Sequence, residues 1–156
     1  MKMMNRRTLL AATLAATLSP VTAMAEQSTI SAAEANDAVQ AGSMILIDVR
    51  RPEEWMQTGV AEGAWLLDMT DENFGAYLMA VLDRNPEHDV AIICRTGNRT
   101  GYLMERLRKN GIDRVLDVSE GMAGGPNGTG WIPAGLPIAE ARATYDAMPK
   151  DLIAAK

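Results

Sequence analysis

The stretch VAIICRTGNRTGYLM, residues 90–104, decides the architecture that we expect for this chain. A continuously apolar run from Val90 to Ile93 ends at Cys94, and a short turn with one glycine then leads into apolar residues at helical spacing from Thr100 onward. The apolar run predicts a strand buried on both faces, and the second half predicts a helix. A lone cysteine therefore stands where a buried strand passes into a helix.

The same alternation of strand and helix runs through the rest of the chain. Further strands are predicted at 44–49, 64–67 and 114–118. Helices are predicted at 31–41, 71–82, 100–109 and 138–147. Continuously apolar strands separated by helices predict a single α/β domain with a mainly parallel central sheet and helices on both faces.

Three local patterns refine this prediction. Ser31 and Glu34 form a capping-box pattern, which places the start of the first helix at Ser31. Residues 50–63 are polar, and we expect them to be irregular. Residues 119–137 hold six glycines and three prolines, and we expect them to form an ordered loop.

The first 25 residues have the features of an export signal. Lys2, Arg6 and Arg7 give a positive start, Leu9–Leu18 is apolar, and residues 23–25 form an A-x-A cleavage site. The segment RRTLL, residues 6–10, also fits a twin-arginine signal, so both Sec and twin-arginine export remain open. The apolar run is too short to remain as a membrane-spanning helix.

We therefore expect cleavage after Ala25 and a periplasmic mature domain, residues 26–156, without stable membrane insertion. The core of this domain should span about 31–137, followed by the C-terminal helix. The whole chain has 15 basic and 20 acidic residues, and removing the three basic residues of the signal leaves 12 against 20. Such an acidic domain is not expected to bind nucleic acid through bulk charge.

Cys94 has no second cysteine with which to form an internal disulfide, and the chain holds only one histidine, His88. A structural zinc site of four Cys or His ligands is therefore excluded, and we expect neither a metal nor a cofactor. His88 lies between two acidic residues and is expected to be an exposed turn residue. Cys94 is thus either an inert core residue or a thiol kept free for chemistry.

The residues after Cys94 favour chemistry. Binding sites in parallel sheets form at the carboxyl ends of strands, where backbone N–H groups and the positive end of the next helix meet. Gly97 permits a positive φ angle in the turn. Arg95 and Arg99 add positive charge, which together with the helix end favours the nucleophilic thiolate over the thiol.

Several motifs resemble those of the rhodanese family of sulfurtransferases. CRTGNRT, residues 94–100, resembles the active-site loop of the family, and ILIDVRRPEEW, residues 45–55, resembles its early strand-and-turn motif. EGMAGG, residues 120–125, followed by Trp131 and GLP at 135–137, resembles its closing motif. The resemblance covers about Ser31 to Pro137. It departs at 59–64, which lack the usual histidine and proline, and at Met122, where a glycine is common.

The resemblance implies a thiosulfate sulfurtransferase-like enzyme. Cys94 would attack the outer sulfur of a small anionic donor such as thiosulfate, carry a persulfide, and pass the sulfur to a thiol or cyanide acceptor. The substrate would be bound by the loop residues Arg95, Thr96, Gly97, Asn98 and Arg99. Asp48 and Arg50 would support the loop.

Two alternatives remain. One is phosphate or arsenate chemistry: some phosphatases share this type of fold and a cysteine nucleophile but place an arginine six residues after the cysteine, whereas here that residue is Thr100 and Arg99 is the fifth. A non-enzymatic periplasmic persulfide carrier or binding module would have the same motifs. The role of Arg99 is also open, since it could bind a ligand or pair with Asp48 or Glu54.

Overall fold

The sheet at the centre of the molecule has four parallel strands. The computed structural model describes residues 28–152, so the expected signal, residues 1–25, lies outside the described residues. The strands are β1 (Met44–Asp48), β3 (Trp65–Leu66), β4 (Asp89–Ile93) and β5 (Val115–Asp117). Their order is β3-β1-β4-β5, and each neighbouring pair is parallel. The predicted mainly parallel sheet is confirmed.

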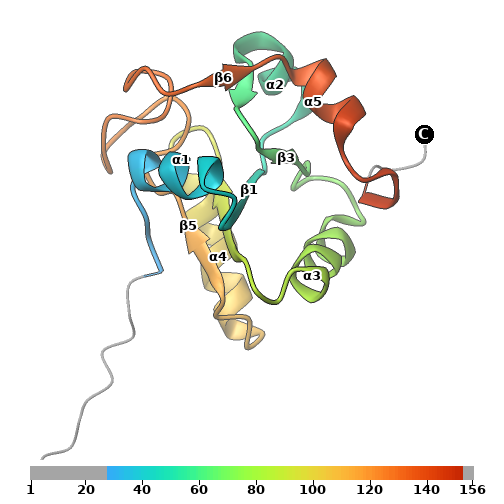
Figure 1. Cartoon of the computed structure of the whole chain (residues 1–156). Coiled ribbons are helices and arrows are strands. Elements are labelled where there is room, and N and C mark those ends of the chain that lie inside the picture. Colours follow the sequence, from blue (N-terminus) through green and yellow to red (C-terminus); the bar gives the residue numbers. More distant parts are fainter. Residues whose placement is uncertain (1–27, 153–156) are drawn as a thin grey trace, which may run out of the picture.

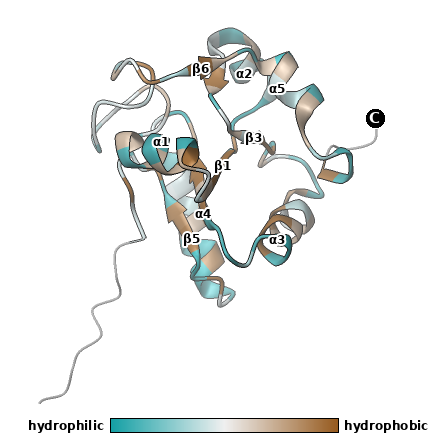
Figure 2. Cartoon of the chain, viewed as in Figure 1, coloured by the Kyte–Doolittle hydropathy of each residue, from teal (hydrophilic) through white to brown (hydrophobic). Residues whose placement is uncertain are grey.

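Helices cover both faces of this sheet, as the sequence predicts. Helix α1 (Ala32–Gln40) lies in front of the sheet in Figure 1, and α4 (Asn98–Lys109) lies behind it. Helix α3 (Phe74–Arg84) packs on the same apolar cluster as α4. Side chains alternate along the strands, so that Leu46 faces the cluster of α1 and Ile47 faces that of α3 and α4. Figure 2 shows the resulting hydrophobic centre of the sheet.

The first helix begins as its sequence predicts. The Ser31 hydroxyl accepts the Glu34 N–H at 3.2 Å, and the Glu34 carboxylate accepts the Ser31 N–H at 3.1 Å. Both halves of the capping box are therefore formed. Helices α2 (Pro52–Thr58), α3 and α4 end at Gly59, Asn85 and Asn110, which are common residues at helix ends. None of the helices within residues 28–152 combines the length and apolar character needed to cross a bilayer.

The prediction that residues 50–63 are irregular is wrong. They contain α2 (Pro52–Thr58) and β2 (Val60–Ala61). Pro52 occupies the first turn of α2, where its missing N–H has no cost, and the Glu54 carboxylate accepts the Arg51 N–H at 3.2 Å. Trp55 is the only buried residue of α2, so the short helix has no apolar periodicity to reveal it.

The predicted helix at 138–147 is correct only in its second part. Ile138–Ala139 forms β6, which pairs antiparallel with β2, and α5 spans Ala141–Ala147. The Glu140 carboxylate caps α5 by accepting two N–H groups of its first turn, at 2.9 and 2.7 Å. A short 3-10 helix, Lys150–Leu152, ends the described chain.

Candidate active site

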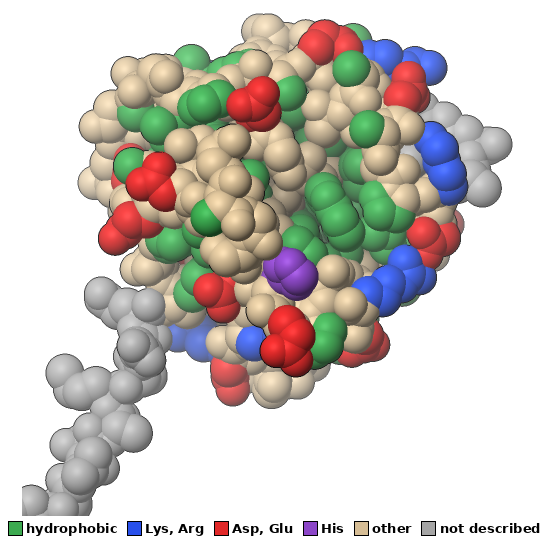
Figure 3. Space-filling model, viewed as in Figure 1, with side chains coloured by type: hydrophobic (Ala, Val, Ile, Leu, Met, Phe, Trp, Pro, Cys, Tyr) green, Lys and Arg blue, Asp and Glu red, His purple; other side chains and the backbone are tan. Residues whose placement is uncertain are grey.

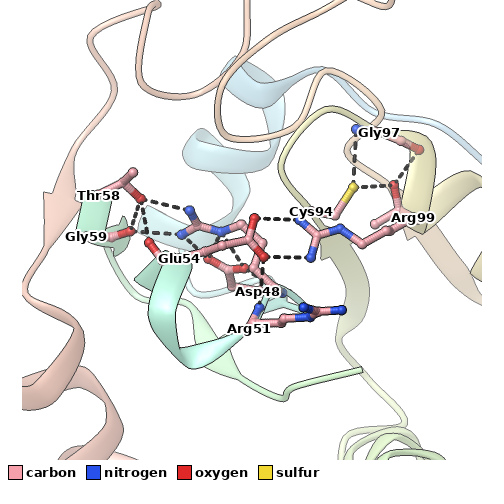
Figure 4. Close-up of polar contacts among 10 residues, drawn as sticks. Asp48, Arg51, Glu54, Thr58, Gly59, Cys94, Gly97 and Arg99 are labelled. Atoms are coloured by element: carbon pink, nitrogen blue, oxygen red, sulfur yellow. Dashed lines mark hydrogen bonds and ion pairs between the residues drawn. The ribbon is translucent and has the colours of Figure 1, made fainter. Parts of the chain in front are cut away.

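Cys94 directly follows β4, and the residue is 1% exposed. Its Sγ accepts the N–H of Gly97 at 3.2 Å, while α4 begins at the next residue, Asn98. The sulfur therefore lies at the carboxyl end of a central strand and at the N-terminus of a twelve-residue helix, as Figure 4 shows. An N–H donor and the positive helix end both stabilise negative charge at this position.

Gly97 has the conformation that the turn was expected to need. Its φ angle is +85°, in the left-handed region. A Cβ atom at this position would lie 2.0 Å from the backbone oxygen of Ser119. Both the backbone angle and the close approach of a second chain segment exclude a side chain here.

Thr100 is a site residue that the sequence prediction missed. Its hydroxyl lies 3.6 Å from Cys94 Sγ and donates a hydrogen bond to the carbonyl of Gly97 at 3.0 Å. The residue is completely buried. The sequence could have pointed to Thr100, because it is a hydroxyl residue at the end of the loop. There the first turn of the helix brings the side chain back toward the sulfur.

The remaining loop residues differ in exposure and in their contacts. Arg95 and Asn98 are exposed, and Thr96 and Arg99 are partly exposed. Arg95 takes part in none of the ion pairs found within residues 28–152. Arg95 directly follows Cys94 in the chain and is exposed, so its free positive charge is available to an anionic ligand.

Arg99 pairs with Glu54, which decides between its two expected partners. Its two terminal nitrogens donate to the two Glu54 carboxylate oxygens at 2.7 and 2.6 Å. This bidentate contact holds the pKa of Glu54 below its usual value and raises the pKa of Arg99. Since Glu54 lies on α2 and Arg99 on α4, the pair fixes one end of the loop to a neighbouring helix (Figure 4).

Asp48 and Arg50 form a buried ion pair behind the site. The side chains are 0% and 2% exposed, and Arg50 Nη2 lies 2.7 Å from Asp48 Oδ2. Arg50 also donates to the Thr58 hydroxyl and to the Gly59 carbonyl, both at 2.8 Å. These contacts hold the end of β1 against the end of α2. No side-chain hydrogen bond among the described residues joins this pair to Cys94, so any effect on the sulfur is indirect.

The glycine-rich segment 119–137 is an ordered loop, as expected, and it braces the cysteine turn. The N–H groups of Met122 and Ala123 donate to the carbonyls of Cys94 and Arg95, each at 2.8 Å. Trp131 anchors the segment, since it is fully buried and its indole N–H donates to the Pro137 carbonyl at 2.9 Å. The turn around Cys94 is therefore held from two sides, by α4 and by this segment.

A cavity of about 470 Å³ lies apart from the cysteine turn. It is lined by residues of α2, α3, α5 and the segment after β3, including Trp55, Tyr77 and Tyr145. None of the predicted site residues lines it. His88 is exposed, as expected, and belongs to neither feature. Figure 3 shows one face of the molecule, with apolar side chains gathered to the right of its centre, acidic side chains on both sides and basic side chains mainly along the right-hand and lower edges.

Residues 31–125 match the family model described as Rhodanese-like domain. The chain belongs to this family. The match begins at the N-cap of α1 and ends within the glycine-rich segment, so it includes Cys94 and the whole turn around it. The rhodanese-like domain indicates sulfurtransferase or persulfide chemistry, with sulfur donors and thiophilic acceptors as partners in general.

Individual relatives of this rhodanese-like domain are distant. It is 24% identical over 98 residues to Uncharacterized protein RP600 of Rickettsia prowazekii, covering 59% of this chain and 80% of that protein. Among solved structures, it is similar to Rv0390 from M. tuberculosis, with 25% identity, a TM-score of 0.55 and coverage of 72% and 96% of the two chains. A rhodanese-related protein from Thermoplasma volcanium has 25% identity, a TM-score of 0.50 and coverage of 71% and 96%.

Proposed function

We propose that this rhodanese-like domain is a sulfurtransferase that moves a sulfane sulfur from a thiosulfate-like donor to a thiophilic acceptor through a Cys94 persulfide. One observation carries the proposal. The only cysteine has its sulfur 3.2 Å from a backbone N–H at a helix N-terminus, and the residue that follows it, Arg95, takes part in none of the ion pairs within residues 28–152. A thiolate and a persulfide anion are both stabilised by such an environment, and an anionic donor is attracted to it.

The reaction has two half-reactions. The Cys94 thiolate attacks the outer sulfur of thiosulfate, so that a new S–S bond forms while the S–S bond of the donor breaks and sulfite leaves with the electron pair. The thiolate or cyanide acceptor then attacks the outer sulfur of the persulfide, and Cys94 leaves as a thiolate. Gly97 N–H faces the sulfur in both steps, and Arg95 attracts the anionic donor.

The pairing of Arg99 argues against the phosphatase and arsenate reductase alternatives. Such enzymes need an arginine fork that binds the equatorial oxygens of a tetrahedral oxyanion. Here both terminal nitrogens of Arg99 are bound to Glu54. The sixth residue after the cysteine is Thr100, which has no positive charge. A persulfide carrier without turnover remains the second candidate, because the same turn would hold the same persulfide.

Mass spectrometry of the intact mature protein tests the proposal. Thiosulfate should add about 32 Da, one sulfur atom, to the wild type, and cyanide should remove it as thiocyanate. The Cys94→Ser variant should fold normally and gain no mass, because a hydroxyl cannot carry a persulfide. Repeated turnover would favour the enzyme over a carrier. Hydrolysis of a generic phosphate ester through Cys94, without sulfur uptake from any donor, would overturn the proposal.

We also infer that the protein is exported and works in the periplasm. The positive start, the apolar run Leu9–Leu18 and the A-x-A site support this inference. N-terminal sequencing of the native protein should begin at Glu26, and a sequence that begins at Met1 would contradict it. Changing Arg6 and Arg7 to lysine should stop export by the twin-arginine route and leave Sec export intact.

A further inference from the structure

The cavity of about 470 Å³ has no role in the proposed sulfur transfer. Its wall is formed by residues of α2, α3 and α5, by Leu152 and by the segment that follows β3. Most of the lining side chains are apolar or aromatic, and the volume lies within the range of about 300–1,000 Å³ that is typical of small-molecule sites. The apolar side chains gathered in Figure 3 lie in the region between α3 and α5 of Figure 1. The cavity therefore has the size and the wall of a ligand site.

Two carboxyl groups on the cavity wall have no cationic partner within residues 28–152. Asp68 and Asp71 take part in none of the ion pairs of this range. Each is oriented by its own turn, since Asp68 Oδ1 accepts the Thr70 N–H at 2.8 Å and Asp71 Oδ1 accepts the Asn73 N–H at 2.7 Å. The side-chain hydrogen bonds of the described residues leave Oδ2 of both carboxylates free. The wall thus offers two negatively charged acceptors.

The positive charge on the wall has its own counterion. Arg142 is the only basic side chain among the described residues that line the cavity, and its Nε lies 3.1 Å from Asp146 Oδ2. On the elements that carry the wall, Arg84 pairs with Asp151, and the ammonium group of Lys150 donates to the Asp146 carbonyl. The charged groups of the wall therefore favour a positively charged ligand over an anion.

Three aromatic side chains complete the wall, namely Trp55 of α2, Tyr77 of α3 and Tyr145 of α5. Burial raises the pKa of Tyr145, and the negative charge of Asp71 adds a smaller contribution in the same direction. The phenol is therefore neutral at neutral pH, and it lies close enough to Asp71 to sense its charge. The faces of aromatic rings attract cations, so a cation bound at Asp71 gains from the aromatic wall as well.

Trp55 also has a donor that the described residues do not satisfy. The residue is 5% exposed, and its indole N–H has no hydrogen-bond partner within residues 28–152. Asn36 and Asp117 each have a buried atom in the same state, but neither residue lines the cavity. The indole N–H of Trp131, by contrast, donates to the Pro137 carbonyl. A buried donor without an acceptor is the kind of atom that a bound water or ligand satisfies.

We propose that this cavity binds a small organic cation with an apolar or aromatic body. The ammonium group of the ligand binds the free oxygens of Asp68 and Asp71, and its body fills the space against the aromatic side chains. An acceptor on the same molecule would satisfy the indole N–H of Trp55. The site is separate from the cysteine turn but shares α2 with it, since Trp55 lines the cavity and its neighbour Glu54 binds Arg99.

The test compares three compounds of similar shape: the 2-phenylethylammonium cation, neutral 2-phenylethanol and anionic 3-phenylpropionate. Proton–nitrogen NMR spectra of the mature protein report on the site, because the chain has three tryptophans and the signal of Trp55 is identified by its loss in Trp55→Phe. The ammonium compound should shift the indole signal of Trp55 in a saturable manner and leave that of Trp131 in place. The alcohol should bind about tenfold more weakly, because it lacks the charge that two carboxylates attract, and the anion should not bind.

A charge-removing variant and added salt test the role of the carboxylates. Asp71→Asn should weaken binding of the ammonium compound about threefold to tenfold and leave binding of the alcohol unchanged. Asp113→Asn is the matched control, since Asp113 is exposed and lies outside the wall, and both compounds should bind it as they bind the wild type. Added salt should weaken binding of the ammonium compound to the wild type and spare the alcohol, which needs no variant to fold.

Equal affinity of the wild type for the ammonium compound and the alcohol would overturn the inference, because the cavity would then select no charge. The absence of binding at millimolar concentration, or binding that leaves the Trp55 signal in place, would do the same. A dimer in light scattering that dissociates on Met56→Asp would show that a second copy covers the wall, and would also reject the inference. The measurements use no sulfur donor, so either result leaves the proposed sulfur transfer to its own test.

Discussion

Replacing Asp48 with alanine should destabilise the protein strongly, although Asp48 does not touch Cys94. The change removes three side-chain contacts of 2.7 to 3.0 Å from Arg50 and leaves its guanidinium buried, with only the Thr58 hydroxyl and the Gly59 carbonyl as acceptors. Breaking a buried pair in this way costs about 3–5 kcal/mol, because the remaining charge has no counterion. For a domain of this size, the melting temperature should fall by roughly 10–20 °C.

Thermal unfolding followed by circular dichroism measures this effect, and two comparisons make it specific. Asp89→Ala is the matched control, since Asp89 is exposed at the start of β4 and its loss should change the unfolding free energy by less than about 0.5 kcal/mol. The double variant Asp48→Leu, Arg50→Met removes both charges and should be more stable than Asp48→Ala. Equal losses of unfolding free energy in Asp48→Ala and Asp89→Ala would refute the reasoning. So would a double variant whose loss of unfolding free energy equals the sum of the losses caused by Asp48→Leu alone and Arg50→Met alone.

Three other changes test two residues of the cysteine turn, Arg95 and Gly97, and the α2 residue Glu54 that pairs with Arg99. Arg95→Ala should raise KM for thiosulfate more than it lowers kcat, because it removes an attractive charge and not the nucleophile; unchanged steady-state kinetics would reject this role. Gly97→Ala should cost about 2–4 kcal/mol from strain and overlap, whereas Gly101→Ala in the open first half of α4 should be neutral or stabilising in the same denaturant titration. Glu54→Gln should cost about 1 kcal/mol or less, since its pair with Arg99 is partly exposed. Because that pair lowers the pKa of Glu54, its contribution is present above the ordinary carboxyl pKa of about 4.3 and is lost as pH falls below it, so the melting temperatures of wild type and Glu54→Gln should converge in acid.

The central sheet and the position of the nucleophile follow from local sequence. Runs such as 44–47 and 90–93 are apolar without interruption, and only a strand covered on both faces accounts for that pattern in so short a length. The placement of Cys94 then follows from the geometry of parallel sheets, because the end of a strand and the start of the next helix coincide in space. The left-handed angle at Gly97 also follows, since the turn allows few other conformations.

What the sequence does not reveal depends on contacts between distant segments. The strand at 138–139 exists because it pairs with 60–61, and neither segment alone has a strand pattern. From the sequence alone, Glu54 and Asp48 are equally suitable acidic partners for Arg99. The path of α2 decides that the Glu54 carboxylate is the one that binds it. Asp117 has the same appearance in the sequence as any acidic residue at the end of a strand. Only its burial in the structure distinguishes it.

The bracing of the cysteine turn by the glycine-rich segment has a consequence for the order in which the site is assembled during folding. Helix α4 can form from its own residues, but the carbonyls of Cys94 and Arg95 receive their hydrogen bonds from Met122 and Ala123, which come much later in the chain. The turn acquires its final shape only when this later segment has docked, and long-range contacts of this kind close late. A chain cut before residue 121 should therefore retain helix content yet lack a formed site. Grafting CRTGNRT alone onto another strand-helix junction should fail for the same reason.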